Sequence, residues 1–402
     1  MALTVRTDRL VAGGDAMGRA DDGRVVFVTG ALPGELVEVD VAETKKDFSR
    51  GRVQQVLEAS GDRIRPVCLH RLAGCGGCGW MHLEPTAQLS AKADIVRESL
   101  RRVGRLDESH IAQIVAVGGA VDPFGYRTTI RVVGGPDGTL GYREERSAQM
   151  VPINSCPIAE SSLSRLLRQI ELDPGAEVTL RVSVATGAIT AIWSKEHHKG
   201  IRGLPAHVHI GERGWLSERI AGHDLRVSAG SFFQSGAQGA ELLVDAVARS
   251  APELATARHA VDAYGGVGLF AVTTMASAGH VTVVESSKSA CFDAKHNLAE
   301  RSGGVGSATI TRSEVGRWRA PADRPIDAVV ADPARSGLGK PGVAALTAGR
   351  PPVLVLVSCD PVSLARDVTL MGANGYRAES VEVLDLFPNT PHVETVTRFA
   401  PT

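Results

Sequence analysis

The sequence predicts an α/β protein with a small N-terminal β-barrel, a β-rich middle and a C-terminal, Rossmann-like parallel sheet. The chain of 402 residues is too long for one ordinary core, and a usual domain size of about 150 residues suggests two or three units. Short β-rich runs separated by glycine turns fill the first 60 residues and return between residues 120 and 230. After residue 231, strands alternate with longer helical stretches, which is typical of a doubly wound parallel sheet.

Residues 1–60 contain the runs RVVFVTG, LVEVDVAE and GRVQQVLEAS, which are separated by turns such as LPGE. This alternation indicates a small barrel of short strands. The net charge of the chain is −1, so it lacks the strong positive charge of a nonspecific nucleic-acid binder. Any contact with RNA has to use local basic patches, although each patch can also be an ordinary solvated face. The patches are Lys45, Lys46, Arg50 and Arg52, and Arg101, Arg102 and Arg105.

Residues 61–230 begin with a group of cysteines and continue with a helix and several hairpins. The helix is expected over residues 85–104, where Ile95, Leu100 and Val103 keep a loose helical spacing. The hairpin segments, among them RTTIRVVGGPDGTLGYRE, carry Gly or Asp-Gly at their turns. We therefore expect a β-rich central domain.

Four cysteines of this central segment have the spacing of metal ligands. Three of them follow the pattern C-x6-C-x2-C, and the fourth precedes a proline in the distant run SCPI. Zinc sites and iron-sulfur clusters can both use four thiolates, while a Cys-Pro ligand is typical of ferredoxins. The candidate ligands are Cys68, Cys75, Cys78 and Cys156. Cys291 lies in a helical stretch and is interpreted as a buried thiol.

No hydrophobic run approaches the roughly 18 residues that a membrane helix needs, and the N-terminal residues lack the pattern of a secretory signal. We therefore expect a cytoplasmic protein that has no membrane partner and keeps its cysteines reduced. We also expect a monomer.

The run HAVDAYGGVGLFA predicts a nucleotide-binding turn after a strand of the C-terminal segment. Gly266, Gly268 and Ala271 form a G-x-G-x-x-A pattern, and Glu285 ends the next strand, where its carboxylate can bind ribose hydroxyls. This pattern fits a nicotinamide cofactor almost as well as S-adenosylmethionine. Asp262 at the end of the first strand favours S-adenosylmethionine, because a carboxylate repels a pyrophosphate but tolerates a cationic sulfonium.

Two further strands end in polar residues at the same edge of the predicted sheet. Asp332 and Arg335 follow one of them, and Cys359 and Asp360 follow the other. Ligands of open α/β sheets bind outside the carboxyl ends of the strands, so Cys359 is expected to face the cofactor crevice. A buried thiol without a chemical role is the alternative. Together with Glu394, these groups suit the alkylation of a weakly nucleophilic carbon by a methyl donor.

The order of the motifs resembles the bacterial RNA 5-methyluridine methyltransferases, most of all the iron-sulfur branch that modifies 23S ribosomal RNA. The runs that carry the resemblance are SFFQSG, DAYGGVG, DPARSG, SCDP and HVE. The resemblance implies that residues 1–60 are an OB-like TRAM domain that binds RNA and that residues 61–230 hold a 4Fe-4S cluster. It also implies that residues 231–402 are a class I methyltransferase domain, on which the helix over residues 85–104 packs.

The resemblance further implies roles for individual residues. Cys359 is expected to add to carbon 6 of a uracil, and Glu394 to act as the base that removes the proton from carbon 5. The residues expected to contact S-adenosylmethionine are Gln234, Tyr264, Gly266, Gly268, Glu285, Ser313 and Asp332. The four cysteines named above are the expected cluster ligands. Asp360 replaces an asparagine of the family, and its charge would raise the pKa of Cys359 if the two groups are close.

Several alternatives stay open. The expected RNA is 23S ribosomal RNA, and tRNA is the second candidate. A cytosine-C5 methyltransferase also uses a cysteine adduct, although its usual Pro-Cys motif does not surround Cys359. A non-catalytic iron-sulfur RNA-binding protein would leave Cys359 and Glu394 without a role. A nicotinamide oxidoreductase would leave the SCDP and HVE motifs without one.

Overall fold

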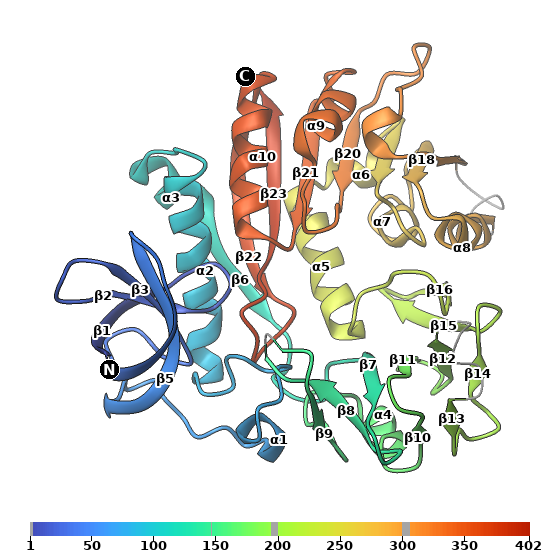
Figure 1. The fold of residues 1–402 in the computed structure, drawn as a ribbon. Coiled ribbons are helices and arrows are strands. Elements are labelled where there is room, and N and C mark those ends of the chain that lie inside the picture. Colours follow the sequence, from blue (N-terminus) through green and yellow to red (C-terminus); the bar gives the residue numbers. More distant parts are fainter. Residues whose placement is uncertain (1–2, 146, 194–199, 300–305) are drawn as a thin grey trace.

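The first strands of the chain close into a five-stranded barrel (Figure 1). The computed structural model describes residues 3–145, 147–193, 200–299 and 306–402. Around the barrel the order is β1-β2-β3-β5-β4, with β3 and β5 parallel and the other neighbours antiparallel. Alternate side chains point inward, so Val26, Val28, Val37 and Val39 are fully buried. The strands are β1 (Leu3–Leu10), β2 (Ala16–Arg19), β3 (Val25–Thr29), β4 (Leu36–Thr44) and β5 (Phe48–Glu58).

Helix α2 (Pro85–Arg102) lies between the barrel and the C-terminal sheet (Figure 1). Its first residue is a proline, whose fixed φ suits the first turn of a helix. Ile95 on α2 and Trp80 just before it join the apolar core of the barrel. Val96 and Leu100 on the same helix join the core of the C-terminal sheet. The helix is thus buried on two sides and connects units that are distant in sequence. Two short helices, α1 (Leu69–Leu72) and α3 (Glu108–Ile114), flank it in the chain.

The central segment forms a six-stranded sheet in the order β14-β12-β11-β7-β8-β9. Its neighbours pair antiparallel except for β14, which runs parallel to β12. The strands are β7 (Thr129–Gly134), β8 (Leu140–Arg143), β9 (Met150–Pro152), β11 (Glu177–Val182), β12 (Ile189–Trp193) and β14 (His209–Ile210). Helix α4 (Ser161–Leu166), the pair β10 (Glu171–Leu172) and β13 (Ile201–Arg202), and the hairpin β15 (Trp215–Ile220) and β16 (His223–Ser228) complete the segment.

The C-terminal sheet has eight strands in the order β19-β18-β17-β20-β21-β23-β22-β6. The first five are parallel, β23 runs antiparallel between β21 and β22, and β6 runs parallel to β22. Strands β17, β20 and β21 are buried along their whole length, as expected of a parallel sheet covered on both faces. The strands are β6 (Val115–Ala120), β17 (Ala260–Ala263), β18 (His280–Glu285), β19 (Ser307–Arg312), β20 (Ala328–Ala331), β21 (Val353–Ser358), β22 (Tyr376–Asp385) and β23 (Glu394–Pro401). The helices are α5 (Ala237–Ser250), α6 (Glu253–Thr256), α7 (Leu269–Val272), α8 (Lys288–Ala299), α9 (Gly339–Thr347) and α10 (Pro361–Ala373), with the 3-10 helix η3 (Val315–Arg317).

This architecture confirms the predicted fold class. The helix expected over residues 85–104 is α2, which packs against α10, β22 and β6. Strand β6 was not predicted: it precedes the central sheet in the chain but joins the far edge of the C-terminal sheet. The division into domains at residues 60 and 230 stays a prediction. Within the described ranges, no helix is long and apolar enough to cross a membrane.

Candidate active site

The turn after β17 brings the backbone close to the carboxyl edge of the C-terminal sheet. Gly266 and Gly268 have φ angles of 55° and 88°, the left-handed region that glycine adopts without strain. Tyr264 also has a positive φ, 58°, which is uncommon for a non-glycine residue and is found most often at functional sites. At Gly265, a Cβ atom would lie 2.7 Å from Cγ1 of Val283, so a side chain there would collide with β18. The turn is therefore held tightly against the neighbouring strand.

Glu285 at the end of β18 fixes this turn from the side. Its Oε2 accepts a hydrogen bond from the Gly266 N–H at 3.0 Å, and its Oε1 accepts one from the Ser287 N–H at 2.6 Å. Asp262 at the penultimate position of β17 is fully buried, and its Oδ2 accepts a hydrogen bond from the Ala271 N–H in α7 at 2.9 Å. Burial raises the pKa of the Asp262 carboxyl to about 7. In this structure Asp262 therefore binds the start of a helix.

A hollow of about 420 Å³ opens between this turn and the ends of β18, β19 and β20, a volume typical of small-molecule sites. Three predicted cofactor residues, Tyr264, Glu285 and Ser313, line it. We call it the donor hollow. Gly266 and Gly268 shape the adjoining turn. Asp332 is not part of the lining, although Ala334, two residues further on, is. Gln234 is buried between β16 and α5, and the described contacts do not place it at the hollow.

A second group of predicted residues meets where β21 ends and β23 begins. Ser358 pairs with Thr395 in the antiparallel ladder of these strands, so Cys359 and Glu394 lie opposite each other one position further along. Asp332 follows β20, the parallel neighbour of β21. Glu394 is buried, while Cys359 and Asp332 are half-buried. The structure thus brings together a thiol and two carboxyl groups that come from three strands.

Burial and mutual repulsion control protonation in this group. Burial, followed by the charges of Glu394 and Asp332, raises the pKa of the Cys359 thiol to about 12, while Arg335 acts in the opposite direction. Burial, with a smaller effect of Asp332, raises the pKa of Glu394 well above its usual range. Burial also raises the pKa of Asp332 to about 7. In the ligand-free protein at neutral pH, Cys359 is therefore a thiol, and burial favours the protonated form of Glu394.

Asp360 has a different role from the one suggested by its charge. Its carboxylate accepts a hydrogen bond from the Ser363 N–H at 2.7 Å and caps the N-terminus of α10. The carboxylates that raise the pKa of Cys359 are Glu394 and Asp332. Asparagine and aspartate are both good N-cap residues, so the exchange of one for the other keeps the cap.

His392 is a neighbour of this group to which the sequence analysis gave no role. Nε2 of its ring lies 3.4 Å from Nη2 of the exposed Arg335 side chain. Burial, followed by the nearby cations Arg335, Lys92 and Arg127, lowers the pKa of His392 to about 4. The ring is therefore neutral at physiological pH. Its position in the HVE motif, two residues before Glu394, was the available signal.

The four candidate metal ligands line another hollow, of about 390 Å³, together with Tyr142 and Arg127. Burial and the proximity of the other thiols raise the pKa values of Cys75 and Cys78, the latter to about 12, and burial also raises that of Cys156. Among the described residues, no group of three or more His, Cys, Asp or Glu side chains is arranged to hold a metal ion. The four thiols line a common space. These thiols belong to Cys68, Cys75, Cys78 and Cys156.

A doubly wound sheet with a glycine turn after one central strand, an acid at the end of the next and a hollow beside them fits a methyltransferase that uses S-adenosylmethionine. Comparisons with known proteins identify the family. The profile of the TRAM domain matches residues 3–54, which form most of the barrel. An uncharacterized RNA methyltransferase of Streptomyces avermitilis is 33% identical over 97% of this chain and 96% of its own. The chain therefore belongs to the family of RNA methyltransferases with an N-terminal TRAM domain.

Two further relatives have more specific names. A protein of Shewanella piezotolerans named 23S rRNA (uracil(1939)-C(5))-methyltransferase is 28% identical over 94% of this chain and 91% of its own. The crystal structure of Pyrococcus abyssi tRNA (uracil-54, C5)-methyltransferase with S-adenosyl-L-homocysteine superimposes with a TM-score of 0.72 at 24% identity, and covers 100% of this chain and 99% of that one. This structural similarity shows a shared fold.

Replacement of Glu285 by alanine is expected to weaken the binding of S-adenosylmethionine at least about tenfold, a loss of about 1.4 kcal/mol. The change removes a carboxylate from the donor hollow and the bond that holds Gly266. Calorimetry with the donor and with RNA measures both affinities, and RNA binding should stay nearly unchanged. Glu253→Ala, which removes an exposed ion pair with Arg398, is the control. Tight nicotinamide binding without donor binding would contradict the cofactor assignment.

Alkylation of Cys359 by iodoacetamide is expected to be slow at pH 8 and to rise with pH toward about 12. With a pKa of about 12 instead of 9.0, the thiolate fraction of Cys359 at pH 8 is about a thousandth of the usual one. The thiolate is the form that reacts with iodoacetamide. A donor analogue with an ammonium in place of the sulfonium should accelerate labelling, whereas S-adenosylhomocysteine, whose thioether sulfur is neutral, should not. Mass spectrometry of the peptide with Cys359, with Cys359→Ser as the blank, measures the rate. Equal acceleration by both analogues would exclude an effect of the cation.

Proposed function

We propose that this RNA methyltransferase transfers a methyl group from S-adenosylmethionine to carbon 5 of a uridine, through a covalent adduct between Cys359 and carbon 6 of the base. The observation that carries the proposal is the pairing of β21 with β23, which sets a thiol opposite a buried carboxyl group at the carboxyl edge of the sheet. The donor hollow opens at the same edge.

The chemistry of uracil requires such a pair of groups. Carbon 5 is too weak a nucleophile to attack a sulfonium methyl group. Addition of the Cys359 thiolate to carbon 6 gives an enolate whose carbon 5 attacks the methyl group, and S-adenosylhomocysteine leaves. Carbon 5 then carries both its hydrogen and the new methyl group. Glu394 removes this proton, the bond between sulfur and carbon 6 breaks, and the thiolate leaves with its electron pair.

Both groups have to reach their charged forms before this sequence can proceed, and a bound cationic donor favours those forms. Cys359 has to become a thiolate, and the positive charges of a sulfonium and of Arg335 both favour that form. Glu394 has a raised pKa, so its carboxylate is a stronger base than an exposed glutamate. Arg335 is exposed at the crevice, where it can also contact the base or a phosphate of the RNA.

We propose 23S ribosomal RNA as the substrate, with tRNA as the second candidate. The Shewanella relative is named for a uracil of 23S rRNA and the Pyrococcus relative for a uracil of tRNA. Both names support uracil as the target base, and they give 23S rRNA and tRNA as the candidate substrates. The barrel also supports RNA binding. Cζ of Arg50 lies 5.0 Å from the ring centroid of Phe27 and 5.4 Å from that of Phe48, so a cation lies beside two aromatic rings, a combination that binds nucleic acids. The target base has to leave its stack to reach Cys359, at a cost of a few kcal/mol.

We further propose that the four thiols hold a 4Fe-4S cluster. Four thiols that line one hollow support this assignment, because four Cys thiolates are the usual ligands of such a cluster. The buried hydroxyl of Tyr142 also lies at this hollow beside the Cys156 thiol, and it can donate a hydrogen bond to the sulfur of that ligand. A bound cluster would link the loop of Cys68, Cys75 and Cys78 to the central sheet near Cys156.

Anaerobically purified protein is expected to be brown and to contain about four irons and four acid-labile sulfides per chain, the content of a 4Fe-4S cluster. Cys156→Ser should lose the cluster and lower the thermal stability together, because Cys156 alone of the four lies in the central sheet region. Cys291→Ser, at a half-buried thiol elsewhere, is the matched control and should keep both. Stoichiometric zinc without iron or sulfide would contradict the assignment.

Cys359→Ala and Glu394→Gln are expected to have different defects. Cys359→Ala should block methyl transfer and every covalent protein-RNA complex, because nothing remains to add to carbon 6. Glu394→Gln should still form the adduct but retain the carbon 5 proton, so the adduct should accumulate on denaturing gels. RNA with 5-fluorouridine should trap the wild-type protein in the same way. Normal turnover by Glu394→Gln would mean that another group is the base, and methylation by Cys359→Ala would exclude the covalent mechanism.

A further inference from the structure

Residues 386–393, which we call the active-site loop, connect β22 to β23. Glu394 follows the loop directly as the first residue of β23. Hydrogen bonds within the loop give it a fixed shape. The Phe387 N–H donates to Oδ1 of Asp385 at 3.0 Å, and the Thr390 hydroxyl donates to the Phe387 carbonyl at 2.7 Å. Asn389 adopts a left-handed conformation with a φ of 66°. Such a conformation persists only where surrounding contacts hold it.

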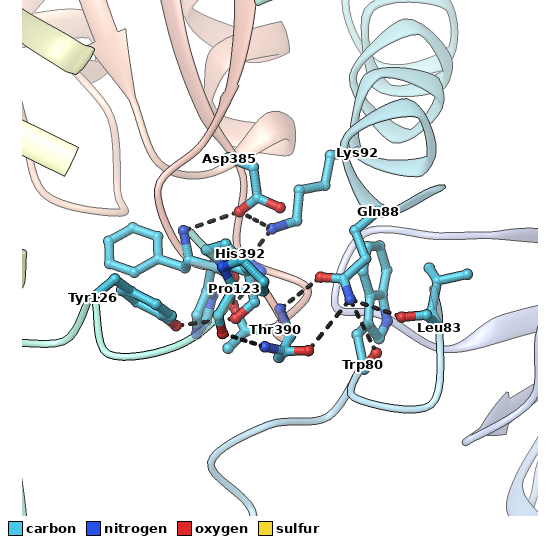
Figure 2. A network of polar contacts seen from close by, with 12 residues as sticks. Trp80, Leu83, Gln88, Lys92, Pro123, Tyr126, Asp385, Thr390 and His392 are labelled. Atoms are coloured by element: carbon cyan, nitrogen blue, oxygen red, sulfur yellow. Dashed lines mark hydrogen bonds and ion pairs between the residues drawn. The ribbon is translucent and has the colours of Figure 1, made fainter. Parts of the chain in front are cut away.

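Helix α2 supplies two of these contacts from buried polar side chains (Figure 2). Oε1 of Gln88 accepts a hydrogen bond from the Asn389 N–H at 2.6 Å. Nζ of Lys92 lies 2.5 Å from Oδ1 of Asp385 and donates to the Phe387 carbonyl at 3.2 Å. Gln88 and Lys92 are both fully buried. A buried ion pair contributes little net stability, because the desolvation of both charges offsets their attraction.

Three further contacts hold the loop: one comes from Trp80, which lies beside Gln88, and two come from the segment of Pro123 and Tyr126 (Figure 2). The backbone N–H of Trp80 donates to the Asn389 carbonyl at 2.9 Å, and Nδ2 of Asn389 donates to the Pro123 carbonyl at 2.7 Å. The Tyr126 hydroxyl donates to the Pro388 carbonyl at 3.0 Å. The active-site loop is therefore fixed by groups that lie more than 250 residues earlier in the chain.

We propose that Gln88 and Lys92 are positioning residues that hold the active-site loop, and so fix His392 and Glu394 in relation to Cys359. This inference rests on the proposed function. Cys359 belongs to a different element, the end of β21, and none of these contacts involves it. Loosening the loop therefore displaces the base and leaves the nucleophile in place. Removal of the carbon 5 proton should suffer more than addition to carbon 6.

Two variants test this separation. Gln88→Met keeps the length of the side chain and removes the acceptor for the Asn389 N–H. The double variant Lys92→Met with Asp385→Asn removes the ion pair without leaving a buried charge unpaired. Both are expected to lower kcat at least about tenfold, to change KM for S-adenosylmethionine less than about twofold, and to accumulate the covalent RNA adduct as Glu394→Gln does.

Arg63→Met is the matched control. It breaks an ion pair with the fully buried Glu35, and the hydrogen bonds of the Arg63 side chain go to Glu35 and Gly30 in the barrel and not to the active-site loop. It is expected to lower the thermal midpoint as the two test variants do, without adduct accumulation. Equal adduct fractions in Arg63→Met and in the test variants, or wild-type turnover by Gln88→Met, would reduce Gln88 and Lys92 to a structural role and overturn the proposal.

Hydrogen exchange of the ligand-free protein tests the positioning apart from the chemistry. The peptide that covers residues 386–393 should exchange at least about tenfold faster in both test variants than in the wild type and in Arg63→Met. An unchanged rate overturns the proposal. If wild-type protein forms no adduct with 5-fluorouridine RNA while this peptide does exchange faster in the variants, the covalent mechanism fails and the positioning role stands.

Discussion

Strand β23 lies antiparallel between β21 and β22, and its first residue, Glu394, is therefore opposite the end of β21, where Cys359 lies. A parallel strand at this position would begin at the other edge of the sheet and would carry its first residue away from the crevice. The carboxyl ends of β17, β18 and β20 supply the donor hollow and Asp332 at the same edge. One reversed strand thus adds a buried acid to a crevice that is otherwise built from parallel strands alone.

The same crevice concentrates acidic groups in a poorly hydrated place. Asp262, Asp332 and Glu394 all have raised pKa values, chiefly because burial disfavours their charged forms. A cation that enters such a site favours the charged forms and releases protons. An anionic pyrophosphate would have the opposite effect. The electrostatics of the site therefore agree with a sulfonium donor better than with a dinucleotide.

Much of this arrangement could be predicted from the sequence, because the strands of a parallel sheet are local runs that end in recognisable motifs. DAYGGVG and SCDP each place their chemistry at a strand end, and the direction of the strands brings those ends to one edge.

Contacts between segments that are distant in the chain left no such signal. A lysine in a helix is usually exposed to solvent, and only the tertiary structure shows that Lys92 is buried against Asp385. Asp360 was interpreted by its charge, whereas its geometry makes it a helix cap. His392 was visible in its motif, but its neutrality depends on burial beside Arg335 and Lys92.

Strand β6 has a consequence for the synthesis of the protein. Val115 in β6 pairs with Val381 in β22, more than 260 residues later. At the usual translation rate, this delay is roughly 13 to 50 s, during which β6 has no partner for the backbone groups on that edge. An unpaired strand of this kind is a site where nascent chains associate with one another. Helix α2 is complete before β6 emerges and also awaits β22 and α10, so the N-terminal third of the chain carries two incomplete surfaces through most of its synthesis. The catalytic sheet is thus the last part of the molecule to close, and chaperones that shield strand edges should matter more for this protein than its moderate length alone would suggest.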